Sequence, residues 1–540
     1  MEAKKLLIVG GGSAGWMAAA YLEAALRDNG RRDVEVALIE SPDVPRIGVG
    51  EATIPNIKHI LSVIGIDEID FLRQVSGTFK QAIKYVDWLH GAGEHYYHPF
   101  DGFRVQPIDR AARRWLMSDR SIPFADTTSL QPVVCELGLA PKPLASQTGG
   151  PSLAYAYHMD ALKFADLLTG IATARGVRHH IDHVTGVERA DNGDIAAVHT
   201  RSGQRLEADL YIDCTGFASL LIEKELGVGW VDCSQWLLCN RAVTLNVPYE
   251  HHYSGHVRPY TTATALSSGW VWEIPLQHRK ALGYVHSSDF ISEDEAVREL
   301  KAFEGPHAQS LDTRTVHFRV GHRAKVWARN CIAIGLAGNF IEPLESTGLY
   351  LSDLATVMLA EHFPHEDADR EILARRYNRI MANRFYEILD FINMHYCLTR
   401  RSDTPFWREI RRPERVNDRL RAKLAFWRTK LPSKSDFVDQ FLPGQAASPL
   451  PDGGLPGDHR PPVDTAGVFG IESYEAILYG MDFLADESDR WFGRDRPATK
   501  VPRFIVENLK RAPRALPAHD VWLQRLAGMP VFPRTRGHRS

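Results

Sequence analysis

Residues 6 to 16 read Leu6-Leu7-Ile8-Val9-Gly10-Gly11-Gly12-Ser13-Ala14-Gly15-Trp16, an apolar run followed directly by a glycine-rich turn. The apolar run is typical of a strand that is buried on both faces of a parallel sheet. Residues 16–26 are rich in alanine and have helical periodicity, and residues 34–39 form a second apolar run. Strand, turn, helix and strand in this order make a β-α-β unit. We therefore predict an α/β protein, α+β overall, built on a Rossmann-like domain.

The glycines of this turn have the spacing Gly10-x-Gly12-x-x-Gly15 between a strand and a helix, the context that a dinucleotide-binding fingerprint requires. Gly10 allows the tight turn, Gly12 lets the backbone approach a pyrophosphate, and Gly15 lets the helix pack close to the sheet. Ser13 and Ala14 lie in the turn just before the helix, whose N-terminal N–H groups suit phosphates. The alternative is a glycine-rich turn that holds no ligand.

Later segments favour FAD, because so long a cofactor needs contacts from distant parts of the chain. Glu40 ends the second strand, where a carboxylate accepts hydrogen bonds from a ribose. Two further turns carry glycines, Asp213-Cys214-Thr215-Gly216 and Gly335-Leu336-Ala337-Gly338. The segment from Arg46 to Pro55, which includes Val49, Gly50 and Ala52, is glycine-rich and is expected to approach the ligand by its backbone.

Composition excludes several other classes of protein. The 540 residues are 44% hydrophobic and 24% charged, with a net charge of −3, which is typical of a globular protein and not of a nucleic-acid binder. The six cysteines are scattered and indicate reduced thiols, with no metal site. No segment approaches the ~20 apolar residues of a membrane span. We therefore expect a cytoplasmic protein.

The pattern along the chain suggests two regions. Residues 1–350 would form the FAD-binding module with an inserted substrate-side sheet at about 80–150 and 235–320. Residues 56–90 are expected to be mostly helical, 91–150 irregular, 235–320 an antiparallel sheet, and Cys331 to Leu336 another buried strand. Residues 351–540 would be mostly helical, with a Pro/Gly-rich loop or lid at about 443–467.

The segment Gly269-Trp270-Val271-Trp272-Glu273-Ile274-Pro275 places two tryptophans two residues apart. Side chains at i and i+2 of a strand point to the same face. Trp270 and Trp272 would therefore form one aromatic wall, and Pro275 would end the strand. The alternative is ordinary core packing.

With the glycine fingerprint, residues 47–55 and the segment Phe340-Ile341-Glu342-Pro343-Leu344-Glu345-Ser346-Thr347-Gly348, the tryptophan pair resembles the flavin-dependent tryptophan/indole halogenases. The hallmark of that family is Trp-x-Trp-x-Ile-Pro, and its Phe-x-x-Pro-x-x-Ser-x-Gly pattern is intact here. The resemblance implies an enzyme that uses reduced FAD, oxygen and chloride or bromide to form hypohalous acid, which substitutes an indole-like ring. It also implies a separate NAD(P)H-dependent flavin reductase as partner, and a homodimer stays open.

The resemblance assigns the reaction to three residues. Lys80 matches the catalytic lysine and would hydrogen-bond hypohalous acid or form a haloamine; the alternative is a solvated helix charge. Glu345 would stabilise the cationic ring and take its proton, with Ser346 beside it; the alternative is a cap or salt-bridge carboxylate. Backbone N–H groups of Thr347 and Gly348 would bind the halide. Glu342 is a competing carboxylate whose alternative role is structural.

On the substrate side, His98 and Phe100 match the positions that stack on the ring, with ordinary packing as the alternative. Trp270 and Trp272 would keep the substrate away from the flavin. Enzymes that act on free tryptophan carry two tyrosines and a glutamate in a late segment, where only Tyr474 corresponds here. Free tryptophan is therefore doubtful as the substrate, and the alternatives are an indole without the amino-acid group, another phenol or indole, and a tryptophan within a larger molecule.

Two other functions remain open. A single-component aromatic hydroxylase of the same fold would oxidise NAD(P)H without halide, and the tryptophan wall argues against it. A flavin-binding protein that acts through partners would leave every indole unchanged, and the presence of Lys80 and Glu345 argues against it.

Overall fold

The computed structural model describes residues 4–31, 33–46, 48–100, 109–144, 153–433, 435–438 and 467–535. The predicted loop at 443–467 therefore lies outside the described residues except for Gly467. Among the described residues, no helix combines the length and apolar character that crossing a membrane requires.

The first sheet has six strands in the order β20-β21-β12-β1-β2-β8. All neighbouring pairs are parallel except β20 with β21. Its strands are β1 (Lys4–Val9), β2 (Val34–Glu40), β8 (Arg178–Ile181), β12 (Leu210–Asp213), β20 (Trp327–Ala328) and β21 (Cys331–Ala333). The predicted β-α-β unit and Rossmann-like fold class are confirmed, while the predicted strand at 331–336 ends earlier because Gly335 turns the chain into a 3-10 helix.

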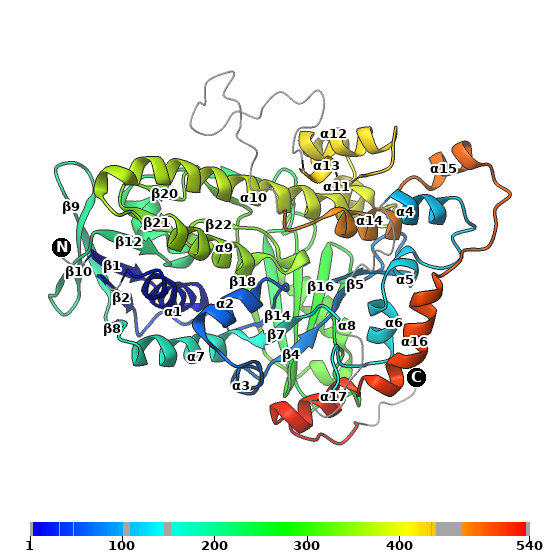
Figure 1. The fold of residues 1–540 in the computed structure, drawn as a ribbon, viewed down its shortest axis with the longest axis horizontal. Helices are drawn as coiled ribbons and strands as arrows, with labels where there is room; N and C mark the ends of the chain where they lie inside the picture. Colours follow the sequence, from blue (N-terminus) through cyan, green and yellow to red (C-terminus); the bar gives the residue numbers. More distant parts are fainter. Residues whose placement is uncertain are drawn as a thin grey trace.

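Helices cover this sheet because its parallel strands are apolar on both faces. Helix α1 (Ser13–Asp28) packs against α7 (Ala161–Ala174) and α9 (Gly348–Glu361), and lies between them in Figure 1. The alanines of α1 are buried, so the helices approach closely. Helix α10 (Arg370–Leu398) runs from the region of β20 toward the second sheet (Figure 1).

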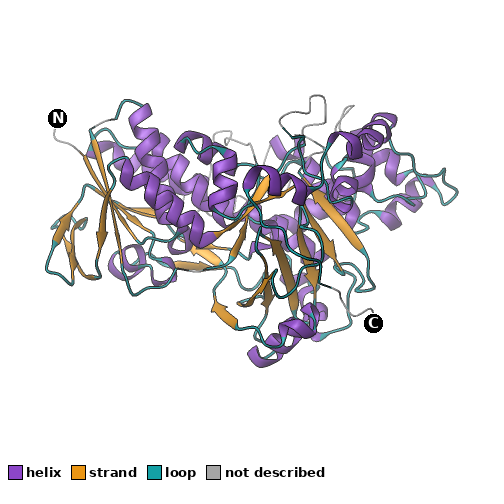
Figure 2. Cartoon of the chain, turned by 90° about the horizontal axis from the view of Figure 1, so that it is seen from below, coloured by secondary structure: helices purple, strands orange, loops and turns teal. Residues whose placement is uncertain are grey.

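The second sheet has seven strands in the order β18-β14-β17-β16-β15-β5-β6. Its strands are β5 (Ala82–Val86), β6 (His95–Pro99), β14 (Arg241–Pro248), β15 (Thr261–Ala265), β16 (Gly269–Pro275), β17 (Arg279–His286) and β18 (Thr313–His317). Only β15 with β5 is parallel. The antiparallel sheet predicted at 235–320 is confirmed. In Figure 2 the strands form one group beside the N-terminus and a second group nearer the C-terminus.

The predicted helical segment at 56–90 is correct only in its first half. Helices α2 (Ile57–Ile64) and α3 (Glu68–Gln74) are followed by β4 (Thr78–Lys80) and β5. The later part is extended because β4 pairs with β7 and β5 pairs with two strands of the large sheet. Long-range pairing and the β-branched and aromatic side chains outweigh the apparent helical pattern.

The segment at 91–150 was predicted to be irregular, but its described residues, 91–100 and 109–144, contain β6 and three short helices. Three small sheets complete the strands: β3 (Gly50–Ala52), β7 (Ala156–Asp160) and β4; β9 (Val184–Arg189), β10 (Ile195–Thr200) and β11 (Arg205–Glu207); β13 (Trp230–Asp232), β19 (Gly321–Arg323) and β22 (Asn339–Phe340). The remaining helices are α4 (Asp109–Leu116), α5 (Phe124–Thr128), α6 (Gln131–Glu136), α8 (Glu293–Glu304), α11 (Pro405–Ile410), α12 (Asp418–Trp427), α13 (Ser435–Val438), α14 (Ile471–Gly480), α15 (Ala485–Phe492), α16 (Arg503–Ala515) and α17 (His519–Trp522).

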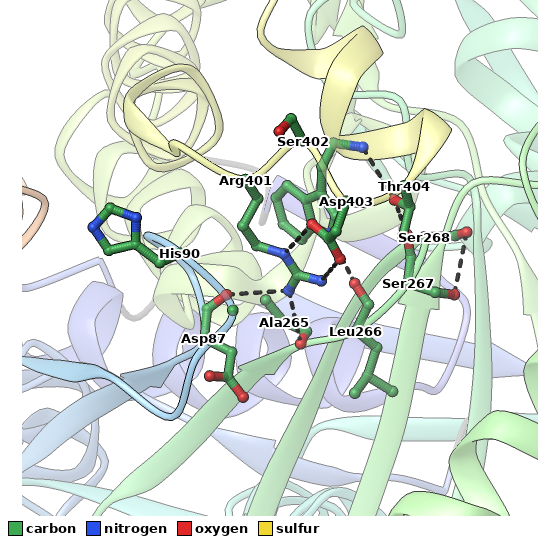
Figure 3. Close-up of polar contacts among 12 residues, drawn as sticks. Asp87, His90, Ala265, Leu266, Ser267, Ser268, Arg401, Ser402, Asp403 and Thr404 are labelled. Atoms are coloured by element: carbon green, nitrogen blue, oxygen red, sulfur yellow. Dashed lines mark hydrogen bonds and ion pairs between the residues drawn. The ribbon is translucent and has the colours of Figure 1, made fainter.

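The buried residue Arg401, just after the end of α10, links that helix to the ends of strands in the second sheet (Figure 3). The guanidinium of Arg401 donates to the carbonyl oxygens of Asp87 at 3.1 Å and Ala265 at 3.2 Å, and pairs with Asp403 at 2.7 Å. Asp87 follows β5 and Ala265 ends β15. These contacts join the segment after α10 to the ends of β5 and β15.

We predict that Gly283→Ala destabilises the protein by about 1–3 kcal/mol through overpacking. Gly283 lies opposite Trp272 in the β16–β17 pair, and a Cβ at Gly283 would lie 1.9 Å from the Trp272 indole. Urea unfolding measures the change. The matched control is Gly170→Ala in α7, where the added Cβ meets no described atom within 4 Å, and a gain of about 0.5–1 kcal/mol is expected. A Gly283→Ala variant as stable as the parent would contradict the fixed indole position.

Candidate active site

Three glycine turns meet at the carboxyl edge of the six-stranded sheet, where adjacent parallel strands β1, β12 and β21 end. Gly10 has a φ of +113°, and a Cβ there would lie 2.3 Å from the carbonyl oxygen of Cys214. Gly335 has a φ of +72°, and its added Cβ would lie 2.9 Å from that of Ala14. Only glycine suits both positions. The predicted row of glycine turns at a ligand-binding edge is thus present.

The start of α1 fits the phosphates of a dinucleotide. A Cβ at Gly15 would lie 2.0 Å from the carbonyl oxygen of Gly10, so the helix begins directly on the turn. Gly12 is the N-cap, has no side chain to bond the first N–H groups, and faces no described atom within 4 Å of an added Cβ. These N–H groups are therefore free to bind an anion. The residues present fit FAD at this edge.

The other predicted FAD-binding residues border the same edge. Ser13 Oγ donates to the carbonyl oxygen of Ala161 at 3.2 Å, and the N–H of Ala161 donates to Val49 at 3.2 Å. Gly50 and Ala52 are buried in β3, which follows Val49. Gly338 ends the 3-10 helix that Gly335 begins. These roles stay predictions.

Glu40 lies at the end of β2 beside the glycine turn, where a Cβ at Gly11 would meet its carboxylate at 1.9 Å. The Glu40 carboxylate accepts hydrogen bonds from Arg46 Nη2 at 3.0 Å and from Trp16 Nε1 at 3.3 Å. The carboxylate is therefore held in place by protein groups, and its predicted contact with a ribose stays a prediction.

Lys80 ends β4 with its side chain fully buried, so the alternative of a solvated helix charge is wrong. Its Nζ donates to Ser346 Oγ at 2.7 Å and to the carbonyl oxygen of Thr53 at 3.0 Å. The ring of Phe100 lies 5.1 Å from Nζ. Burial lowers the pKa of Lys80 to about 7, although the negative charges of Glu345 and Glu51 oppose the shift. The amine is therefore poised between its charged and neutral forms at neutral pH.

Glu345 is buried in the 3-10 helix Pro343–Glu345, next in the chain to the Ser346 that holds Lys80. Its Oε1 accepts from Tyr85 at 2.6 Å and from His395 Nε2 at 2.9 Å, and its Oε2 lies 2.8 Å from His98 Nδ1. Burial favours the neutral acid, but attraction to His98 and hydrogen bonds from His395 and His98 outweigh it and lower the pKa of Glu345. The carboxylate is available as a base.

The chain turns sharply between Glu345 and α9. Ser346 has a left-handed φ of +57°, and α9 begins at Gly348 with Thr347 as its N-cap. Thr347 is fully buried, and its Oγ1 has no hydrogen-bond partner among the described residues. Gly348 leaves open space where a Cβ would be. An unpartnered donor beside a helix N-terminus suits an anion, so this turn fits the predicted halide site.

The predicted ring-stacking residues lie beside the carboxylate. His98 is in β6 opposite Ile83, and its ring centroid is 5.6 Å from that of Phe391 on α10. Phe391 stacks on Phe469 at 3.8 Å. Phe391 and Phe469 thus pack on the His98 ring that contacts Glu345, while Phe100 lies near Lys80 Nζ. Phe391 and Phe469 had no motif to mark them in the sequence.

Tyr474 contacts Phe391, the ring that also contacts His98, so Phe391 connects Tyr474 to His98. It is 1% exposed in α14, and its ring packs edge-on against Phe391 at 4.9 Å and against Trp427 at 5.4 Å. Its hydroxyl has no hydrogen-bond partner among the described residues. The structure therefore brings Tyr474 next to the ring that contacts His98, and its role in binding substrate stays a prediction.

The tryptophan pair forms the aromatic surface that the sequence predicts. Trp270 and Trp272 are 1% and 8% exposed, and their ring centroids are 6.1 Å apart. Trp270 Nε1 donates to Glu342 at 3.1 Å, and Trp88 packs against Trp270 at 6.4 Å. Both indoles are thus buried in core packing, and their role in separating substrate from the flavin stays a prediction.

Four residues of the site were missed by sequence reasoning: Tyr85, His395, Thr53 and Glu51. Tyr85 and Lys80 are in segments read as helical, and residues 82–86 show no strict apolar–polar alternation that would mark a strand. His395 lies in a long helix without any motif. Burial raises the pKa of Glu51 to about 7 against the opposing charge of Lys80. These side chains become visible as partners only when the segments are folded together.

A glycine-rich sheet edge that fits FAD, a buried lysine and a histidine-bound carboxylate are together the features of a flavin-dependent enzyme. The family described as tryptophan halogenase matches residues 5–495. Tryptophan 7-halogenase RebH of Lentzea aerocolonigenes is 38% identical over 444 residues, covering 78% of this chain and 82% of that protein. The chain belongs to the tryptophan halogenase family and is a flavin-dependent halogenase.

Solved structures agree with this assignment. The crystal structure of a tryptophan halogenase from Shewanella frigidimarina has a TM-score of 0.84 at 32% identity, over 98% of each chain. BrvH, a flavin-dependent halogenase from Brevundimonas sp. BAL3, has a TM-score of 0.78 at 30% identity, over 97% of this chain and 99% of that one. The fold and family follow from both sequence and structure.

We predict that Lys80→Met makes the stability of the protein less dependent on pH. An unfolded lysine stays protonated up to pH 10.5, whereas the pKa of folded Lys80 is about 7. Between these values the unfolded state binds more protons, so the Lys80 contribution to stability rises with pH and is smallest below pH 7. Replacement by methionine removes this slope, which is about 1 kcal/mol per pH unit.

Urea unfolding between pH 7 and pH 9 measures the slope. The control is Lys84→Met, which removes the same charge from the neighbouring strand, where Lys84 pairs with Glu136. We expect the control to keep the slope of the parent protein. An unchanged slope in Lys80→Met would mean that Lys80 titrates as an exposed lysine does.

Proposed function

We propose that the enzyme holds hypohalous acid at Lys80 and Ser346 and directs it to an indole-like ring beside Glu345. Bound reduced FAD supplies the hypohalous acid from oxygen and chloride or bromide. The observation that carries the proposal is the 2.7 Å hydrogen bond between Lys80 Nζ and Ser346 Oγ. Glu345, the residue before Ser346, is held by a hydrogen bond from Tyr85. The proton donor Lys80, on β4, is thereby bonded to the residue that directly follows the base Glu345 on the turn.

Lys80 would act on the oxidant. An ammonium has three donors, and two of those of Lys80 are used by Ser346 and Thr53. The third is available to hydrogen-bond hypohalous acid and polarise its O–halogen bond. Because burial lowers the pKa of Lys80 to about 7, the neutral amine is also accessible and would form a haloamine. Both routes need this buried nitrogen.

Glu345 would act on the ring. Electrophilic substitution leaves a cationic ring that must lose one proton, and an ionised carboxylate stabilises that cation and accepts the proton. Hydrogen bonds from Tyr85, His98 and His395 keep Glu345 ionised and in one orientation. His98 and Phe100 would hold the ring plane next to it.

The substrate that this site suits best is an indole or related aromatic without a free amino-acid group. The described residues of α14 offer Tyr474 but no second tyrosine at position 475, where Glu475 stands. The Tyr474 ring packs edge-on against Phe391 and Trp427, so this tyrosine is part of the aromatic cluster that reaches His98. A separate NAD(P)H-dependent flavin reductase would supply the reduced FAD.

We predict that Lys80→Met and Glu345→Gln both abolish efficient halogenation while FAD still binds. Loss of the Lys80 nitrogen removes the group that holds the oxidant, and loss of the Glu345 charge removes a general base that contributes about 10²–10⁴-fold. Single-turnover product formation and FAD titration measure the two properties. Near-normal halogenation by Lys80→Met would exclude the proposed role of Lys80.

We predict that an aromatic panel incubated with the enzyme, a flavin reductase, FAD and bromide yields brominated indoles. Mass spectrometry recognises them by the paired bromine isotope pattern. Indole and 3-substituted indoles without a carboxylate should react faster than free tryptophan. The reason is that the described residues of α14 lack a clear carboxylate-binding group. A hydroxylated product without bromide would instead indicate an aromatic hydroxylase.

A further inference from the structure

Glu342 is a buried carboxyl group that the proposed reaction does not use. It directly precedes the short 3-10 helix Pro343–Glu345 and is 0% exposed. Its Oε1 accepts hydrogen bonds from Tyr396 at 2.5 Å and from Trp270 Nε1 at 3.1 Å. Burial raises the pKa of Glu342 to about 7, although these two hydrogen bonds oppose the shift. An acid that costs so much to bury needs a structural reason to be there.

Adjacent residues of α10 hold the two acids of this turn. His395 donates to Glu345 and Tyr396 donates to Glu342. Two neighbouring side chains on one helix therefore hold both ends of the turn, Glu342 and Glu345. Arg401, just beyond the end of α10, connects that helix to the ends of β5 and β15 through the carbonyl oxygens of Asp87 and Ala265.

Glu342 also reaches the tryptophan wall. Trp270 is on β16, in the middle of the seven-stranded sheet, and Glu342 is on the turn that leads to Ser346 and Lys80. The single oxygen Oε1 of Glu342 joins the two, because it accepts from Trp270 and Tyr396 together. A displacement of the turn would thus be opposed by both the sheet and the helix.

We propose that Glu342 is a positioning residue that joins the turn bearing Glu345 and Ser346 to the Trp270 indole and to α10, so that the catalytic turn and the aromatic wall keep one relative position. This inference rests on the proposed function, since its consequence is retention of hypohalous acid inside the enzyme. When the turn loosens, Ser346 no longer holds Lys80 in place, and the oxidant escapes before it meets the ring.

The test compares two tyrosines of α10. Tyr396→Phe removes the hydroxyl that donates to Glu342, and Tyr377→Phe removes a similarly buried hydroxyl that donates to the carbonyl oxygen of Ala355 at 2.9 Å. Tyr377→Phe removes one buried hydrogen bond of α10, whereas Tyr396→Phe removes the bond to Glu342 together with a 3.6 Å contact to Cys239 Sγ, and only Tyr396 touches Glu342. Glu342→Gln keeps a neutral acceptor of the same shape, and Glu342→Leu removes the acceptor.

Two measurements are made on each variant. In the first, the enzyme turns over indole with reductase, FAD and bromide while monochlorodimedone traps hypobromous acid that escapes. In the second, hydrogen exchange of the FAD-free protein, followed by mass spectrometry, reports the mobility of residues 343–347. We expect Tyr396→Phe and Glu342→Leu to raise the trapped fraction at least threefold and to speed exchange of the turn, while Glu342→Gln and Tyr377→Phe resemble the parent.

The inference is overturned if Tyr396→Phe and Tyr377→Phe trap the same fraction and exchange alike, even where Glu342→Leu fails to fold. It is also overturned if folded Glu342→Leu retains hypobromous acid as well as the parent. The proposed function fails in a different way, because the parent enzyme itself would then give neither brominated indole nor trapped hypobromous acid. In that case altered exchange in Tyr396→Phe alone would still support the structural role of Glu342.

Discussion

A fully buried carboxylate, Glu345, is the interaction on which the rest of the site depends. Removing a carboxylate from water is costly unless hydrogen bonds replace the lost hydration. Its partners Tyr85, His98 and His395 come from β5, β6 and α10. The charge is therefore stable only when the edge of the large sheet and the long helix meet at this turn, so formation of the site and completion of the fold are the same event.

The same turn connects the two parts of the molecule. Ser346 holds Lys80 on β4, and α9 begins two residues later and packs against α1 of the dinucleotide domain. Because only Thr347 separates Ser346 from the start of α9, a displacement of α9 would also displace Ser346. The nitrogen of Lys80 has a pKa of about 7 because it is buried here, and burial follows from the pairing of β4 with β7. Chemistry at this lysine is a property of the assembled sheets.

Sequence reasoning succeeded where a short segment carries its own physical signature. The glycine turn at Gly10 and the wall at Trp270 and Trp272 are local patterns, and the structure has them as predicted. It failed at 78–86, where helix was predicted and strands were found, because only partners distant in sequence favour the extended conformation. It also missed His395, which enters the site through the packing of a helix without a motif.

The sequence by itself determined the glycine turn between β1 and α1, the tryptophan pair and the family, because backbone conformation and short motifs are local properties. Only the tertiary structure decided that Lys80 is a buried amine with a pKa near 7, that Glu345 stays ionised, and that Glu342 touches the wall. Those properties depend on desolvation and on partners from separate elements. Neither exists until the two sheets and α10 have packed together.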